Sequence, residues 1–147
     1  ICGAGDMAEE VTKETRCVDQ VSFVGWRNAA EVATLLDIGD VGVLPYPNTS
    51  DFLMSYPNKV GEYLAHGLPV LTGLRGVTGK LLDDHHLTVS YREGDVDSCA
   101  RALKGLAASG VSEVRRDTAR ALYRQFFDPD IVYPAYADHV ERVALSR

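Results

Sequence analysis

The sequence predicts an α/β fold: a doubly wound, Rossmann-like parallel sheet with helices on both faces. Short apolar runs suit buried strands, stretches with apolar residues at helical spacing separate them, and glycine, proline or polar turn residues follow each run. The expected strands are residues 21–24, 41–44, 68–71 and 87–91, and the expected helices are residues 7–15, 29–37, 57–66 and 96–108. Because strands and helices alternate along the chain, we expect the strands to run parallel.

The two ends of the chain extend this pattern. The opening Ile1 resembles the end of a further strand that runs into the turn Gly3-Ala4-Gly5. Near the other end, residues 112–127 and 131–145 are expected to form two helices. The helices are separated by an Asp-Pro-Asp sequence, whose second aspartate, Asp130, is a good N-cap candidate for the last helix.

Length and composition limit the classes of function. A chain of 147 residues with 46% hydrophobic content fits one domain with a real core. The net charge of -6 argues against a broad nucleic-acid surface, and no apolar run is long enough to span a membrane, so membrane contact is expected to be peripheral at most. The three cysteines form no Cys-x-x-Cys pair, which predicts free thiols, a cytoplasmic location and no bound metal. No cofactor is expected either.

The most informative segment is residues 55–72, SYPNKVGEYLAHGLPVLT. Pro57 suits the first turn of a helix, and Gly67 followed by Pro69 ends it. The N-terminus of such a helix offers unpaired amides and a partial positive charge, which suit a diphosphate. Glu62, one turn further on, is placed to accept hydrogen bonds from sugar hydroxyls.

Within this segment, PNKVGEYLAHGLPVLT resembles the donor-binding segment of the retaining glycosyltransferases of the GT-B type, the family 4 or group 1 enzymes that use nucleotide sugars. The opening ICGAGD resembles the second strand of that domain, VSFVGW the third and DVGVLPYP the fourth, so the resemblance covers nearly the whole chain. It implies a donor-binding domain over residues 1–127 and a C-terminal helix over residues 128–147 that packs on a missing N-terminal domain.

The resemblance also implies that the first strand-helix unit of the domain lies upstream of Ile1. In the family this unit carries the arginine and lysine that bind the donor diphosphate, so the catalytic residues are unknown here. Without that central strand, a gap is expected between the strands at Ile1 and Val41. We therefore expect the sheet either to rearrange or to borrow a strand from a neighbouring molecule, which would give an oligomer.

The implied donor-nucleotide site centres on Glu62, which falls at the family's ribose-binding glutamate. The family's first glutamate corresponds to Met54, so recognition of the transferred sugar departs from the usual pattern. The remaining candidates at the helix start are the Lys59 ammonium group, the amides around Asn58, including those of Lys59 and Val60, and Ser55 as a hydroxyl donor or cap. The simpler interpretations are an exposed helix glutamate, a surface lysine and a serine that only caps.

Two further regions are candidates. Gly25, Trp26 and Arg27 follow an expected strand at its carboxyl end, where the resemblance places the pocket for the nucleotide base, although Trp26 also suits ordinary packing. The connection over residues 45–56 is longer than usual, which suggests either a functional lid or a mobile loop.

The predicted function is binding of the nucleotide-sugar donor within a retaining glycosyltransferase. The full-length enzyme would move a sugar from a nucleoside diphosphate to a glycan or lipid-linked acceptor, most commonly in polysaccharide biosynthesis, and the chain alone is expected to be inactive. A nucleotide-sugar epimerase and a non-catalytic nucleotide-binding module are alternatives. The Gly-x-Gly-x-x-Ala turn over residues 3–8 also fits an NAD domain, but the next expected strand runs into Gly25 and Trp26 instead of an acid that would bind the ribose.

Overall fold

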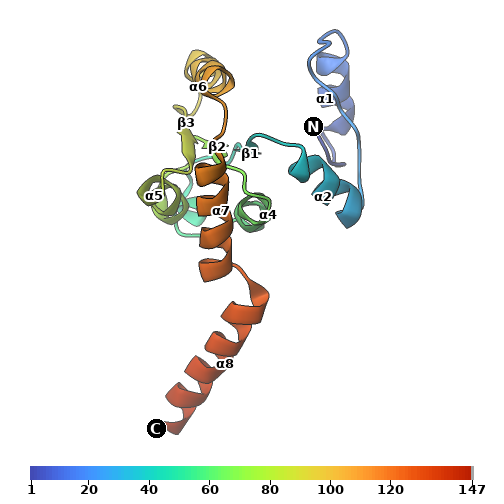
Figure 1. Cartoon of the computed structure of the whole chain (residues 1–147). Helices are drawn as coiled ribbons and strands as arrows, with labels where there is room; N and C mark the ends of the chain where they lie inside the picture. The colour runs from blue at the N-terminus through green and yellow to red at the C-terminus, as the bar shows by residue number, and fades with distance from the viewer. Residues whose placement is uncertain (147) are drawn as a thin grey trace. The chain divides into compact units, whose positions relative to one another are not determined.

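A computed structural model describes residues 1–146 of the chain. These residues belong to two compact units, one over residues 1–38 and one over residues 39–146. Figure 1 shows the elements of both units along the chain.

The first unit contains two helices, α1 (Ala8–Thr15) and α2 (Ala29–Asp37). Asn28 caps α2 in a capping box: its side chain accepts from the amide of Glu31 at 3.0 Å, and the Glu31 carboxylate accepts from the amide of Asn28 at 3.0 Å. Before α2, the amide of Val24 donates to Ile1 O at 2.9 Å, and the Ile1 amino group donates to Ser22 O. These bonds have the form of a parallel pairing, but the pairing is too short to make residues 21–24 a regular strand, contrary to the sequence prediction.

The second unit is built on a sheet of three parallel strands, β1 (Gly42–Leu44), β2 (Val70–Thr72) and β3 (Thr88–Ser90), in the order β1-β2-β3. Figure 1 shows α6 (Val96–Ser109) on one side of the strands, and α4 (Asn58–Ala65), α5 (Gly76–Asp84) and α7 (Glu113–Phe126) on the other. The predicted parallel α/β fold is therefore confirmed. The expected gap between the strands at Ile1 and Val41 stays a prediction, because Ile1 forms no regular strand and belongs to a different unit from β1.

Two helices of the second unit were not predicted. The short helix α3 (Ser50–Leu53) lies inside the long connection that follows β1. Helix α5 contains two glycines, which lower its intrinsic helix propensity, and it is held by the burial of Thr78, Gly79 and Leu82. Tertiary packing therefore outweighs local propensity in α5.

The last helix, α8 (Pro129–Leu145), begins two residues earlier than predicted. Its N-cap is Asp128, whose carboxylate accepts from the amide of Asp130 at 3.0 Å, so the choice of Asp130 as N-cap was wrong. Pro129 occupies the first helical position, where a missing backbone N–H leaves no bond unmade.

The core of the second unit lies between the sheet and the α4–α5–α7 layer. Its buried members are mainly leucine and valine side chains. The cluster consists of Leu44, Val60, Leu64, Val70, Leu74, Leu82, Leu87, Ala119 and Leu122. Burial of a single side chain of this kind contributes about 1.5–3 kcal/mol to folding, so this cluster is what holds α4 against the strands.

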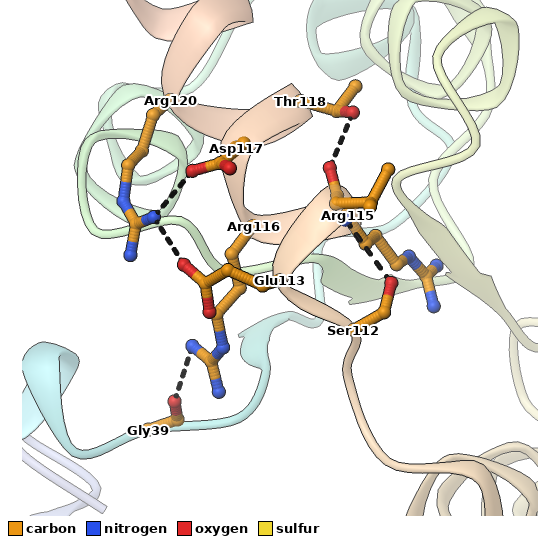
Figure 2. A network of polar contacts seen from close by, with 9 residues as sticks. Gly39, Ser112, Glu113, Arg115, Arg116, Asp117, Thr118 and Arg120 are labelled. Atoms are coloured by element: carbon orange, nitrogen blue, oxygen red, sulfur yellow. Dashed lines mark hydrogen bonds and ion pairs between the residues drawn. The ribbon is translucent and has the colours of Figure 1, made fainter.

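Arginines at the start of α7 tie that helix to neighbouring loops and strands (Figure 2). The Arg115 guanidinium donates to His86 O at 2.9 Å and to Thr88 O at 3.0 Å, at the edge of β3. Burial lowers the pKa of Arg115. Arg116 donates to Gly39 O at 3.2 Å and to a carboxylate oxygen of Asp40 at 2.9 Å. These contacts fix the start of α7 to the residues at the starts of β1 and β3.

Replacing Arg115 with alanine should lower the free energy of unfolding by about 1–2 kcal/mol, because two backbone carbonyl groups at the edge of β3 lose their donor. Urea denaturation followed by circular dichroism would measure the change. Arg92→Ala is a suitable control, since the Arg92 side chain is 79% exposed and lies 3.6 Å from Asp95 in an ion pair. An exposed pair of this kind contributes about 0–1 kcal/mol, so an equal loss in both variants would contradict the role given to Arg115.

Candidate functional site

The N-terminus of α4 is open. Its N-cap is Pro57, which has no N–H and no side-chain acceptor, and no side chain caps the helix. Among residues 1–146, nothing accepts a hydrogen bond from the amides of Asn58 and Lys59. The predicted helix is therefore present, with Pro57 one position before its first residue, and two amides at its start are available for an anion.

Val60 does not take part as predicted. Its amide donates to Pro57 O at 2.9 Å, and its side chain is fully buried in the core. The sequence predicts an open amide at Val60 because the first four N–H groups of an α-helix have no partner within the helix. Here the first turn closes tightly on Pro57, which uses the third amide and leaves the first two.

Lys59 and Glu62 lie together on the exposed face of α4. The Lys59 ammonium group is 3.0 Å from a carboxylate oxygen of Glu62, and the two side chains are 50% and 43% exposed. An exposed pair at this spacing contributes only about 0.2–0.5 kcal/mol, so a ligand could separate it at low cost. Helical geometry thus brings the two predicted charged groups within one turn of the open amides.

The segment before α4 differs from the prediction in one respect. Ser55 does not cap α4; its carbonyl oxygen accepts from the Thr78 hydroxyl at 2.7 Å, which ties this segment to α5. Met54 ends α3 and is 78% exposed. An apolar side chain therefore stands in the solvent at the position that the resemblance assigns to the family's first glutamate.

Tyr63, next to Glu62, was not singled out from the sequence. Its hydroxyl donates to Val43 O at 2.9 Å, at the outer edge of β1. Burial is the main reason that the pKa of Tyr63 is raised, and the charge of Glu62 raises it further. The hydroxyl stays protonated at neutral pH and anchors α4 to β1. A lone tyrosine in a helix gives no sequence signal for such a role.

The expected base-pocket residues lie in the first unit. Gly25 has φ +68° and accepts from the amide of Gly3 at 2.9 Å. Trp26 is 69% exposed, so it is not a packing residue in the described chain. Arg27 donates to Trp26 O at 3.0 Å and lies 4.0 Å from Glu31. Their contact with a nucleotide base stays a prediction.

The described residues contain neither a cluster of metal-binding side chains nor a membrane-spanning helix. Within residues 1–146, no group of three or more His, Cys, Asp or Glu residues is arranged to hold a metal ion. Over the same range, no helix combines the length and the apolar character needed to cross a bilayer.

Comparisons with known proteins agree with the resemblance. A family model described as "Glycosyl transferases group 1" matches residues 1–109. This chain belongs to the group 1 glycosyltransferases. Over 115 residues, this group 1 domain is 30% identical to the "Putative teichuronic acid biosynthesis glycosyltransferase TuaH" of Bacillus subtilis (strain 168), and the match covers 71% of the chain and 28% of the relative.

The group 1 domain also resembles a solved structure. Sucrose-phosphate synthase from Thermosynechococcus elongatus matches 96% of the chain with a TM-score of 0.77 and 16% sequence identity, over 34% of its own length. At this identity the likeness shows the fold alone, an α/β fold of the GT-B type. The chain spans about a third or less of the length of these two proteins.

Proposed function

We propose that this chain binds the donor in a retaining glycosyltransferase that transfers a sugar from a nucleoside diphosphate to a glycan or lipid-linked acceptor. The observation that carries the proposal is the open start of α4, where the free amides of Asn58 and Lys59 lie one turn from the exposed carboxylate of Glu62. Family membership gives this arrangement its chemical meaning, and the TuaH relative, named for teichuronic acid biosynthesis, supports a role in polysaccharide assembly.

In the proposed complex the two amides and the partial positive charge of the helix face the diphosphate. Because negative charge grows on the leaving diphosphate during transfer, preorganised donors at this point stabilise the transition state. The Lys59 ammonium group turns from Glu62 to a phosphate oxygen, and the freed Glu62 carboxylate accepts hydrogen bonds from the ribose hydroxyls. The exposed ion pair between Lys59 and Glu62 is thus exchanged for two contacts with the donor.

The rest of the enzyme is also part of the proposal. A cationic pair and an acceptor-binding domain outside the 147 residues would complete the site, in a cytoplasmic protein that needs no further cofactor and touches the membrane at most at its surface. The exposed Met54 favours a second candidate, a nucleotide-binding module without transfer activity, because the position offers no carboxylate to the transferred sugar.

Isothermal titration with UDP, GDP, ADP and TDP tests donor binding. One nucleoside diphosphate should bind at least about fivefold more tightly than its monophosphate, because the second phosphate reaches the helix amides. The monophosphate serves as the matched control. If none of the four diphosphates gives heat or raises the melting temperature at millimolar concentration, the proposed function is wrong.

A further inference from the structure

Asn48 is the centre of a hydrogen-bond network that the sequence does not reveal. Its side-chain Nδ2 donates to Glu93 Oε2 at 2.7 Å and to Gly73 O at 3.0 Å, and its Oδ1 accepts from the amide of Arg75 at 2.7 Å. The backbone amide of Asn48 also donates to Glu93 Oε2, at 3.2 Å. Both donor hydrogens and the acceptor of the carboxamide are therefore used.

This network joins the loops that follow all three strands of the sheet. Asn48 follows β1, Gly73 and Arg75 follow β2, and Glu93 follows β3. In open α/β sheets, the carboxyl ends of the strands are where ligands bind. One side chain thus sets the spacing of the loops at the functional edge of this unit.

The loop that Asn48 fastens leads directly to the start of α4. Along it, Tyr46 and Phe52 stack with ring centroids 4.6 Å apart, and Ser55 O accepts from the Thr78 hydroxyl at 2.7 Å. The predicted lid or mobile loop over residues 45–56 therefore contains α3 and has anchors near both its ends. These anchors hold the segment that immediately precedes the open amide of Asn58.

We propose that Asn48 and Glu93 are positioning residues of the donor site: they hold the loop over residues 45–56 so that the start of α4 stays open to the diphosphate. The link to the diphosphate rests on the function proposed above. Neither side chain needs to touch the donor, because their effect passes through the loop to the amides.

An exchange of donor and acceptor between the two positions gives a sharp test. Asn48→Asp keeps the acceptor for the Arg75 amide but removes both side-chain donors and faces the Glu93 carboxylate with a second carboxylate. Adding Glu93→Gln restores one donor from the opposite side and removes the repulsion. The single variant should lose the anchoring of the loop over residues 45–56 and part of the diphosphate affinity, and the double variant should recover most of both.

Two measurements on the 147-residue chain test the positioning role of Asn48: hydrogen exchange of the loop and affinity for the diphosphate. Hydrogen exchange of the amides over residues 49–56 should become about tenfold faster in Asn48→Asp, and the affinity for the diphosphate selected in the wild-type titrations should fall about tenfold. Arg115→Ala is the matched control, since it also removes two hydrogen bonds donated by one side chain, but these bonds join α7 to the start of β3 and not to the loops after the strands. It should lower the melting temperature and leave both readouts unchanged.

The possible results separate the positioning role of Asn48 from the proposed donor-binding function. Unchanged exchange over residues 49–56 in Asn48→Asp, or no recovery in the double variant, overturns the positioning role. Faster exchange with unaltered diphosphate affinity overturns the link between the loop and the donor site. If the wild-type chain binds none of the diphosphates, the proposed function fails and the link to the donor fails with it, while hydrogen exchange still decides whether Asn48 fastens the loop.

Discussion

Replacing Glu62 with alanine should weaken nucleoside diphosphate binding about 100-fold without changing the melting temperature. The proposed complex loses two hydrogen bonds from ribose hydroxyls to a charged acceptor, and at this exposed position each contributes about 1.5 kcal/mol, the lower end of the range for charged acceptors. Folding should be unaffected, because the Glu62 side chain is 43% exposed and its partner Lys59 is 50% exposed. Isothermal titration and thermal unfolding of the same preparation would measure both quantities.

The matched control for Glu62→Ala is Asp84→Ala. Asp84 lies on α5 and pairs with Lys80 at 3.0 Å, with side chains 57% and 76% exposed, so the variant also removes an exposed carboxylate from an ion pair within one helix. Its affinity for the diphosphate should equal that of the wild type. Glu62→Gln keeps an acceptor without the charge and should fall between the two, with a loss of about tenfold. Equal affinity in all four proteins would remove Glu62 from the donor site.

Much of the fold could be predicted from the sequence, because its signals are local. The apolar spacing over residues 29–37 predicted α2 to the residue, and the structure adds the capping box at Asn28 that fixes its start. The helix α5 was missed because its two glycines lower helix propensity, and its stability comes from the burial of Leu82 and its neighbours, which only the tertiary structure provides. Asp130 is not the N-cap of α8, because Pro129 lies inside the helix, in its first turn, instead of forming part of the break between the last two helices.

The parts of the candidate site that could be predicted from the sequence are those whose residues lie close together along one helix. Lys59 and Glu62 share a face because they are three residues apart, and the open start of α4 follows from Pro57. Asn48 and Glu93 are 45 residues apart, so nothing in the sequence indicates that their side chains meet. Long-range contacts of this kind depend on the register of the strands that bring the loops together.

Gly76→Ala should be among the most destabilising single changes in the chain, lowering the free energy of unfolding by about 3 kcal/mol or more. Gly76 begins α5 with φ +66°, a conformation that costs an alanine about 1–2 kcal/mol. An added Cβ would also overlap the carbonyl oxygen of Leu53 and lie 2.6 Å from its Cα, so α3 would have to move. Overpacking of this kind costs about 1–3 kcal/mol. Urea denaturation of the purified variant would measure the total.

Gly94→Ala separates the two causes. Gly94 has φ +75°, close to the value at Gly76, but a Cβ added there meets no atom within 4 Å. Gly94→Ala should therefore lower the free energy of unfolding only by the cost of the backbone conformation, about 1–2 kcal/mol. The difference in free energy of unfolding between the two variants then measures the close approach of Leu53 to α5. If the two variants lose the same free energy of unfolding, α3 can move away from the added Cβ without an energetic cost. The loop over residues 45–56 would then be held less firmly at α3 than the contact of Leu53 with Gly76 implies.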